Sequence, residues 1–196
     1  MGEEDIREER LYRIGQQEVS LLNIDLKGRI LDIGGGGEGV IGRIYKDRVI
    51  AIDPNKQELE DAPEGPLKLV MDARVLLFLD GSFDTVTSFF TMMFIPNAYH
   101  DQIFQEAYRV LKPGGEFHLW DATIPPYDNG PKDIYVVPLS IKLMEETIHT
   151  GFGTRWRDKL QSMEYFQDIA RRIGFECSIA DTEGVLLRLI FKRKQQ

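Results

Sequence analysis

Glycines gather in one short segment of this chain, where Gly34, Gly35, Gly36 and Gly37 are adjacent and Gly39 follows closely. A backbone without side chains lets a ligand approach it, and the free N–H groups of a following helix favour negative charge. One or two glycines would be enough for an ordinary turn. The run therefore predicts a loop that binds a ligand with an anionic group.

Two aspartates accompany the loop. Asp32 comes just before the glycines, and Asp53 ends the next apolar run. The carboxyl ends of neighbouring parallel strands face one ligand crevice, where a carboxylate can accept hydrogen bonds from the hydroxyls of a ribose. A carboxylate that merely faces water is the alternative for Asp53.

More than one cofactor suits these residues. Gly34, Gly36 and Gly39 satisfy the G-x-G-x-x-G pattern of dinucleotide-binding enzymes, and Asp53 lies at roughly the 20-residue distance expected of their ribose-binding acid. An NAD(P)-dependent oxidoreductase is therefore one interpretation. Because other adenosine compounds use a similar loop, the glycines alone do not choose between cofactors.

Apolar runs alternate with helical patterns along the first two thirds of the chain. Strands are predicted at 29–33, 48–53, 67–71, 83–90 and 116–120, and helices at 40–45, 55–61 and 96–111. This alternation favours an α/β fold in which helices cover both faces of a parallel sheet. Two last strands, 175–180 and 185–191, have so short a connection that they must pair antiparallel.

Three further segments have their own patterns. Residues 3–22 place apolar side chains at roughly helical spacing among many charges, which predicts an amphipathic helix. Residues 123–159 are rich in proline and contain the alternating run Ile134-Tyr135-Val136-Val137, which predicts an extended, partly β insert. Ser162 is a suitable N-cap for a helix that Gly174 ends.

Five short motifs follow one another between residues 28 and 122. They are Ile30-Leu31-Asp32-Ile33-Gly34-Gly35-Gly36, Asp53, Met71-Asp72-Ala73, Asp80-Gly81-Ser82-Phe83-Asp84-Thr85-Val86 and Arg109-Val110-Leu111-Lys112-Pro113-Gly114-Gly115. In order and spacing they resemble the class I S-adenosylmethionine-dependent methyltransferase family, of the small methyltransferase-domain type and similar to quinone-biosynthesis methylases. The terminal hairpin extends the resemblance to 160–194.

The resemblance implies one domain over residues 1–196 with a Rossmann-like, open, mostly parallel seven-stranded sheet, helices on both faces and an antiparallel last strand. Its segments would be an N-terminal helical lid at 1–26, a cofactor-binding core at 27–122, a substrate-side insert at 123–159, and a last helix with the terminal hairpin at 160–196. The chain is accordingly expected to be an enzyme that uses S-adenosylmethionine and releases S-adenosylhomocysteine.

The resemblance also assigns the cofactor contacts. The loop would touch the methionine part, Asp53 the ribose, and Asp72 with Ala73 the adenine edge, while Asp32 would orient the loop or reach the amino group through water. The family's third glycine falls on Glu38, so either the loop is one residue longer or its register runs through Gly35, Gly37 and Gly39. The predicted cofactor-binding residues are Asp32, Gly34, Gly35, Gly36, Gly37, Asp53, Pro54, Asp72, Ala73, Ser88 and Phe89.

Methyl transfer from a sulfonium is an in-line displacement, in which alignment and exclusion of water matter most. Where the acceptor must lose a proton, His100 and His149 are the candidate bases, with solvated histidines as the alternative, whereas His118 is expected to pack inside a strand. The spacing of these histidines predicts no metal site. The residues expected to line an acceptor pocket are Tyr12, Met92, Met93, Phe94 and Arg155. Ordinary core packing is the alternative for the two methionines and Phe94, and packing on the sheet is the alternative for Tyr12.

Composition narrows the function classes. Twenty-four Lys and Arg against 32 Asp and Glu give a net charge of −8, which argues against a nucleic-acid partner and leaves a small molecule as the expected substrate. Residues 1–5 lack the bases of a signal peptide, and no apolar run approaches the ~18 residues of a membrane span, so we expect a cytoplasmic protein without a membrane partner. The lone cysteine, Cys177, is expected to be a buried core thiol.

A non-catalytic module that holds S-adenosylmethionine or S-adenosylhomocysteine is a further interpretation, because the sequence contains no certain base. The sequence makes no prediction about the acceptor atom or the oligomeric state.

Overall fold

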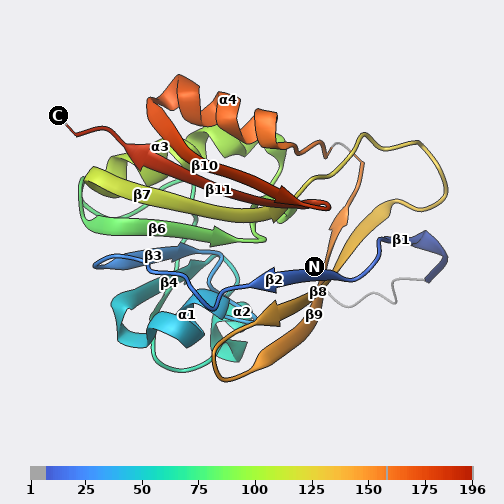
Figure 1. Cartoon of the computed structure of the whole chain (residues 1–196), viewed down its shortest axis with the longest axis horizontal. Coiled ribbons are helices and arrows are strands. Elements are labelled where there is room, and N and C mark those ends of the chain that lie inside the picture. The colour runs from blue at the N-terminus through green and yellow to red at the C-terminus, as the bar shows by residue number, and fades with distance from the viewer. Residues whose placement is uncertain (1–7, 158, 196) are drawn as a thin grey trace.

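The computed structural model, which describes residues 8–157 and 159–195, is built around a seven-stranded sheet (Figure 1). The strand order is β10-β11-β7-β6-β3-β4-β5; strands β3 to β7 are parallel, and β11 runs antiparallel to both of its neighbours. This confirms the predicted open, mostly parallel sheet with its antiparallel terminal hairpin. The strands are β3 (Ile30–Ile33), β4 (Val49–Asp53), β5 (Leu67–Val70), β6 (Phe83–Phe89), β7 (Leu111–Ala122), β10 (Phe175–Glu183) and β11 (Leu186–Arg193).

Helices lie on both faces of the sheet. On one face α3 (His100–Val110) and α4 (Met163–Ile173) pack together over an aromatic core that includes Phe104, Phe117 and Phe166. The other core, which contains Ile30 and Val49, packs against α1 (Val40–Tyr45) and α2 (Lys56–Asp61). Both covering layers bury apolar strand residues, which is the main source of stability of such a sheet.

The predicted ends of α4 are confirmed. The hydroxyl of Ser162 accepts a hydrogen bond of 3.1 Å from the backbone N–H of Tyr165, and Gly174 ends the helix with a φ of +107°. Such a cap satisfies one of the backbone donors that the first turn of a helix leaves unpaired. The cap fixes the point where α4 begins after the insert.

A smaller sheet consists of β1 (Leu11–Arg13), β2 (Gln17–Ser20), β8 (Ile134–Lys142) and β9 (Thr147–Arg155). Strands β8 and β9 form an antiparallel hairpin, which confirms the predicted β character of the insert. Strands β1 and β2 both run parallel to β8 along its other edge. In Figure 1 this sheet lies at the end of the molecule where β6 ends.

The predicted N-terminal amphipathic helix is wrong over residues 8–22, while residues 1–7 lie outside the described residues. After a short 3-10 turn, η1 (Glu8–Arg10), the chain is extended and pairs with β8. The apolar residues of this segment are separated by three and five residues in turn, a spacing that does not keep them on one face of a helix. This local pattern is weak, and pairing with the distant strand β8 overrides it. The lid expected at 1–26 is therefore not a helix where the structure describes it.

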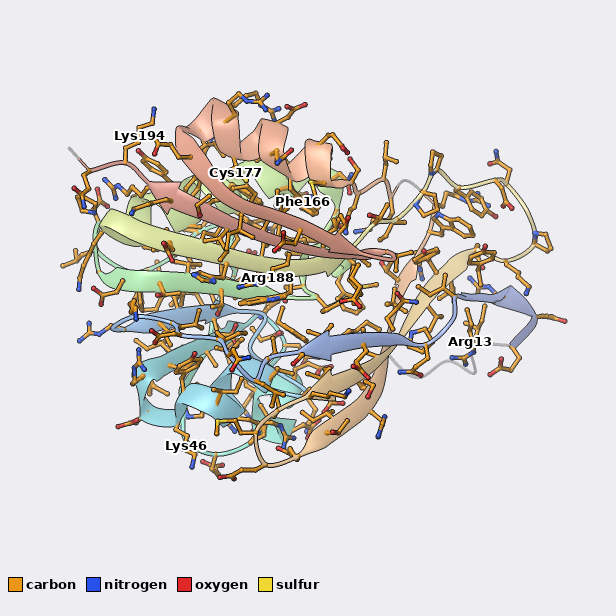
Figure 2. The ribbon with its side chains drawn as sticks, viewed as in Figure 1. Arg13, Lys46, Phe166, Cys177, Arg188 and Lys194 are labelled. Atoms are coloured by element: carbon orange, nitrogen blue, oxygen red, sulfur yellow. The ribbon has the colours of Figure 1, made fainter. Side chains whose placement is uncertain are left out.

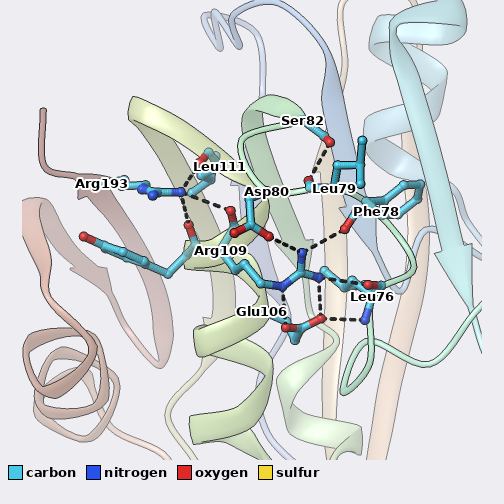
Figure 3. Close-up of polar contacts among 10 residues, drawn as sticks. Leu76, Phe78, Leu79, Asp80, Ser82, Glu106, Arg109, Leu111 and Arg193 are labelled. Carbon is cyan, nitrogen blue, oxygen red and sulfur yellow. Dashed lines mark hydrogen bonds and ion pairs between the residues drawn. The ribbon is translucent and has the colours of Figure 1, made fainter. Parts of the chain in front are cut away.

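One polar cluster ties the segment before β6 to α3 (Figure 3). The guanidinium of Arg109 donates two hydrogen bonds of 2.8 Å to the carboxylate of Glu106, one to Asp80 and one each to the carbonyls of Leu76 and Phe78. Two of these bonds satisfy the backbone carbonyls of Leu76 and Phe78, which lie in an irregular segment that does not pair with a strand. They hold the connection between β5 and β6 against the sheet.

The single cysteine differs from its prediction. Cys177, labelled in Figure 2, is exposed on the edge strand β10 (Figure 1) and is not a core thiol. The prediction failed because β10 is an edge strand on which all residues from Glu176 to Ser178 are exposed. None of the described helices has the length and apolar character needed to cross a membrane.

Candidate active site

A cavity of about 610 Å³ opens where β3, β4 and β6 end. One part of its lining is polar and comes from the glycine loop, α2 and the ends of β4 and β5. The other part is aromatic and comes from the end of β6, the 3-10 turns η3 (Met92–Phe94) and η4 (Asn97–Tyr99), and β9. The charged lining residues are Asp32, Glu38, Asp53, Glu58, Asp72 and Arg74, and the aromatic ones are Phe89, Phe90, Phe94, Tyr99 and Phe152.

The glycine loop is glycine-rich because its neighbours leave no room for side chains. Gly34 has a φ of +73°, and a Cβ there would lie 2.2 Å from Oγ1 of Thr91. A Cβ at Gly36 would lie 2.6 Å from the Cβ of Glu58 and 3.2 Å from Oδ2 of Asp53. A bare backbone at both positions keeps the cavity open between the loop and the carboxylates.

The backbone amides of the loop bind mainly to the protein itself. Those of Gly34 and Gly35 donate to the carbonyl of Ile52 at 2.9 and 3.1 Å, and that of Gly37 donates to the carbonyl of Glu58 at 2.8 Å. These three loop amides are therefore paired within the protein, whereas the expectation of an anion site concerns the free N–H groups of the helix that follows. Helix α1 has only six residues, which makes it a weak source of dipole field.

Asp53 ends β4 and faces the loop, as its sequence position predicts. Its carboxylate accepts one hydrogen bond of 2.8 Å from the backbone N–H of Asn55. Burial raises the pKa of Asp53, and the nearby carboxylate of Glu58 raises it further, while the bond from Asn55 opposes both. The carboxylate retains acceptor capacity toward the cavity, since a carboxylate has about four lone-pair sites.

Asp32 is almost completely buried, with 2% of its surface exposed, at the inner end of the cavity. Its Oδ1 accepts a hydrogen bond of 2.7 Å from the hydroxyl of Thr87. Burial raises the pKa of Asp32 to about 7, although the bond from Thr87 opposes that rise. A cation that enters the cavity would meet a carboxylate with no cationic partner among the described hydrogen bonds and ion pairs.

Asp72 has a partner already. Arg74 donates to the Asp72 carboxylate through Nε at 2.9 Å, Nη2 at 2.5 Å and its backbone N–H at 2.9 Å. These hydrogen bonds lower the pKa of Asp72 and keep it ionised. The guanidinium of Arg74 also lies 4.5 Å from the ring centre of Tyr99, so the pair forms one rim of the cavity.

The aromatic part of the lining is a chain of ring contacts. Phe90 lies 5.0 Å from Phe89 and 5.5 Å from Phe152, and Phe152 lies 6.2 Å from Phe94, between ring centres. Phe90 has a φ of +52°, a left-handed conformation that is costly for a bulky residue and that recurs at functional sites. The ring of Phe90 therefore lies between Phe89 at the end of β6 and Phe152 on β9.

The structure brings most of the predicted cofactor residues into this cavity, and two lie elsewhere. Gly35 packs against Ala51 and Asp32 beneath the loop. Ser88 is fully buried in β6, and its hydroxyl has no hydrogen-bond partner among the described residues. The predicted residues that line the cavity are Asp32, Gly34, Gly36, Gly37, Asp53, Pro54, Asp72, Ala73 and Phe89.

The predicted acceptor residues are scattered. Phe94 lines the cavity, but Met92 and Met93 are fully buried behind it in the two cores. Tyr12 stacks on Tyr135, 5.7 Å between ring centres, away from the cavity lining. Arg155, at the end of β9, is exposed and does not line the cavity either.

The two candidate bases also lie outside the cavity lining. His149 is exposed on β9. His100 is completely buried, so the alternative of a solvated histidine is wrong for it. Its Nδ1 lies 3.0 Å from the hydroxyl of Tyr165 and its Nε2 lies 3.1 Å from the carbonyl of Met92. Burial lowers the pKa of His100 to about 4, which keeps the ring neutral.

Sequence reasoning missed several lining residues. Phe90 was read only as the end of a strand, and Glu58 as part of a short polar helix. Phe152 lies between Gly151 and Gly153 in the predicted substrate-side insert, where the sequence did not single out the ring. Ile148 and Phe152 are four residues apart, a spacing that places both on one face of a strand, and this spacing is a signal that could have pointed to the ring.

Comparison with known proteins identifies the core that carries this geometry. Residues 31–119, from the strand before the glycine loop to the middle of β7, match a family model described as a methyltransferase domain. Over this segment, a little under half of its length, the chain is similar to methyltransferase domains. A methyltransferase of Methanosarcina mazei described as S-adenosylmethionine-dependent has the same fold, with a TM-score of 0.62 over 88% of this chain and 95% of that one at 18% identity.

Curated relatives share the same part of the chain. The 27-O-demethylrifamycin SV methyltransferase of Amycolatopsis mediterranei is 29% identical over 135 residues, which are 63% of this chain and 49% of that protein. A ubiquinone/menaquinone biosynthesis C-methyltransferase of Rickettsia typhi is 30% identical over 124 residues, 55% of this chain and 49% of that protein. The chain thus spans about half the length of these relatives.

The matched methyltransferase domain ends before the insert begins. The loop, Asp53 and Asp72 all lie within the matched residues, whereas β8, β9 and Phe152 follow them. The polar part of the cavity therefore belongs to the shared domain, and Phe152 adds to its aromatic part from outside the matched segment.

Proposed function

We propose that this chain transfers a methyl group from S-adenosylmethionine to a small or medium-sized apolar molecule. The observation that carries the proposal is the division of one cavity into a carboxylate-lined part beside the glycine loop and an aromatic part beside β9. A cationic donor and an apolar acceptor would each find a matching surface, and the two surfaces adjoin at Phe89 and Phe90.

The residues of the polar part suit this cofactor. Asp53 has free acceptor capacity for ribose hydroxyls, and Asp32 is a buried carboxylate suited to a cationic amine or sulfonium group. The bare backbone at Gly36 leaves room between them. When bound, the cofactor supplies an electrophilic methyl group on a positively charged sulfur.

The chain's own contribution to transfer would be alignment and exclusion of water. Phe90, Phe94 and Phe152 surround the acceptor part with apolar surface, which favours a molecule that leaves water readily. The hydroxyl of Thr91 in the lining already donates to the carbonyl of Ile33 at 3.0 Å. No imidazole, thiol or lysine amine lines the cavity in the described part of the chain.

Transfer of tritium from methyl-labelled S-adenosylmethionine into a whole-cell extract, followed by separation of the small molecules from protein and nucleic acid, tests this function. We expect labelled products that partition into an organic solvent, and we expect them to disappear when Asp53→Ala weakens cofactor binding. Label that appears only in protein or nucleic acid would contradict the small-molecule acceptor. A control with Asp101→Asn, which removes an exposed carboxylate paired with Arg172, should leave the product yield unchanged.

The lack of an imidazole, a thiol and a lysine amine in the described lining favours one other candidate, a module that binds the cofactor or its demethylated product without transferring methyl. Binding of S-adenosylhomocysteine without any labelled product would support this module. The assignment of individual cofactor contacts, the cytoplasmic location and the absence of a nucleic-acid partner remain predictions.

A further inference from the structure

A buried polar cluster lies directly behind the aromatic part of the cavity. Its centre is Asp121, a fully buried carboxylate near the end of β7 that does not line the cavity. Oδ2 of Asp121 accepts a hydrogen bond of 3.2 Å from the backbone N–H of Met93. Oδ1 accepts bonds of 2.8 Å from the N–H of Ala122 and 2.9 Å from the side-chain amide of Gln161.

The turn held in this way forms part of the cavity wall. Residues Met92–Phe94 make up η3, and Phe94, Ile95 and Pro96 line the cavity. Met93 itself is buried, so its backbone bond to Asp121 fixes the turn from the inside. A displacement of this bond would move Phe94 relative to Phe152, whose ring it contacts.

Other polar groups fasten the same turn. Nε2 of His100 lies 3.1 Å from the carbonyl of Met92 and 3.2 Å from that of Ile95, and Nζ of Lys159 donates to the carbonyl of Ile95. In a neutral ring Nε2 carries the proton, because both of its neighbours are acceptors. Asp121 differs from these groups because it is the one described side chain that accepts from an N–H of Met92–Phe94.

Gln161 connects this cluster to the segment after the insert. Its backbone pairs with that of Ile124, with N–H to carbonyl distances of 3.1 and 3.0 Å, and its side chain also donates to the carbonyl of Ala122 at 3.1 Å. Asp121 therefore joins the end of β7, the entrance to α4 and the cavity wall. Burial of a carboxylate is costly, and the donors from Met93, Ala122 and Gln161 offset part of that cost.

We propose that Asp121 is a positioning residue that fixes the wall turn Met92–Phe94 and thereby determines which acceptors fit, without contributing to cofactor binding. The inference rests on the proposed function, since it assigns the aromatic part of the cavity to the acceptor. The polar part of the cavity is lined by the glycine loop, α2 and the ends of β4 and β5. An effect on acceptor choice can therefore be separated from an effect on cofactor binding.

Asp121→Asn tests this role because an amide offers one acceptor where the carboxylate offers two. Either the N–H of Met93 or the donors of Ala122 and Gln161 would then face an NH₂ group. We expect hydrogen exchange at the Met93 amide, followed by NMR, to accelerate about tenfold or more, as for the loss of one buried hydrogen bond. The amide of Gly81, which donates to the Arg109 carbonyl elsewhere, should keep its rate.

Two further readouts separate positioning from general damage. The dissociation constant of S-adenosylhomocysteine should stay within about twofold in Asp121→Asn, because the cofactor lining is intact. The set of labelled small-molecule products from cell extract should change in relative yield, while Asp101→Asn, the matched surface variant, gives the wild-type set. The double variant Asp121→Asn with Gln161→Glu, which returns an acceptor to face the new NH₂ group, should recover slow exchange at Met93.

Unchanged exchange at the Met93 amide in Asp121→Asn would overturn the proposal. So would faster exchange with an unchanged product set, or a loss of S-adenosylhomocysteine affinity that accompanies the changed product set. If Asp121→Asn does not fold, the double variant and Lys159→Met take its place. Lys159→Met leaves Asp121 in place, so exchange at the Met93 amide should stay slow; accelerated exchange there would show that Lys159 and not Asp121 holds the wall and would overturn the proposal. Wild-type protein that yields no labelled product would refute the proposed function separately.

Discussion

Replacement of Asp32 by Asn should change how stability depends on pH. In the folded, ligand-free protein burial raises the pKa of Asp32 from 3.8 to about 7. A carboxyl group with a raised pKa holds its proton in the folded state at pH values where the unfolded chain has lost it. Its contribution to stability is therefore complete below pH 3.8 and is lost as pH rises through 7.

The magnitude follows from the proton linkage. Between pH 5 and 7 the folded state binds one proton more than the unfolded state, so the wild type loses about 1.4 kcal/mol per pH unit, or roughly 2–3 kcal/mol in all. Asn at position 32 does not titrate, and its carbonyl can still accept from Thr87. The variant should therefore gain about 2–3 kcal/mol relative to wild type over this range.

Urea denaturation of both proteins at pH 5.0, 6.0, 7.0 and 8.0 measures this difference. Because the other titrating groups are common to both proteins, the difference in unfolding free energy isolates Asp32. A difference that stays constant with pH would refute the buried, raised carboxylate. Binding of S-adenosylmethionine should meanwhile be weaker in the variant, since the buried partner for a cation is gone.

Three other changes probe separate parts of the structure. Asp53→Ala should weaken the binding of S-adenosylhomocysteine by about 1–3 kcal/mol, measured calorimetrically, because charge-assisted bonds to the ribose would be lost; unchanged affinity would remove Asp53 from the site. Phe152→Ala should lower methyl transfer to extract molecules by about tenfold, because the acceptor loses apolar contact with the ring, while the affinity for S-adenosylhomocysteine stays the same. A loss of S-adenosylhomocysteine affinity instead would show that the ring contacts the cofactor and not the acceptor. Arg109→Ala should lower the free energy of unfolding by about 2–3 kcal/mol, because it leaves Glu106 and the carbonyls of Leu76 and Phe78 without their donor; chemical denaturation that shows no loss would contradict the role of this cluster.

The sheet could be predicted from the sequence because its signals are local. Runs such as Val49–Asp53 are buried on both faces, and the glycines and Pro54 mark where such runs end. The terminal hairpin followed from the short connection between its strands. Even the cap at Ser162 was readable, since a capping hydroxyl acts within one turn.

The failures all involve partners far away in the sequence. The segment around Leu11 is a strand because β8, more than a hundred residues later, offers it an edge. Cys177 is exposed because β10 is the last strand of the sheet, a property of strand order that an apolar run does not reveal.

The site shows the same division. Asp32 and Asp53 belong to motifs that place a carboxylate at a strand end, so their positions in the cavity lining could be predicted. Phe152 and Asp121 could not, because the role of each depends on packing against η3 from another part of the chain. His100 was misjudged for that reason too, since its ring is covered by Tyr165 and Phe166 of α4.

Isothermal titration of the ligand-free protein with S-adenosylhomocysteine and, separately, with NADH compares the two adenosine cofactors that the glycine loop could accommodate. Saturable one-to-one binding of S-adenosylhomocysteine, with no heat of binding from NADH at the same concentrations, is the predicted result. Saturable binding of NADH alone would contradict the assignment of this cavity.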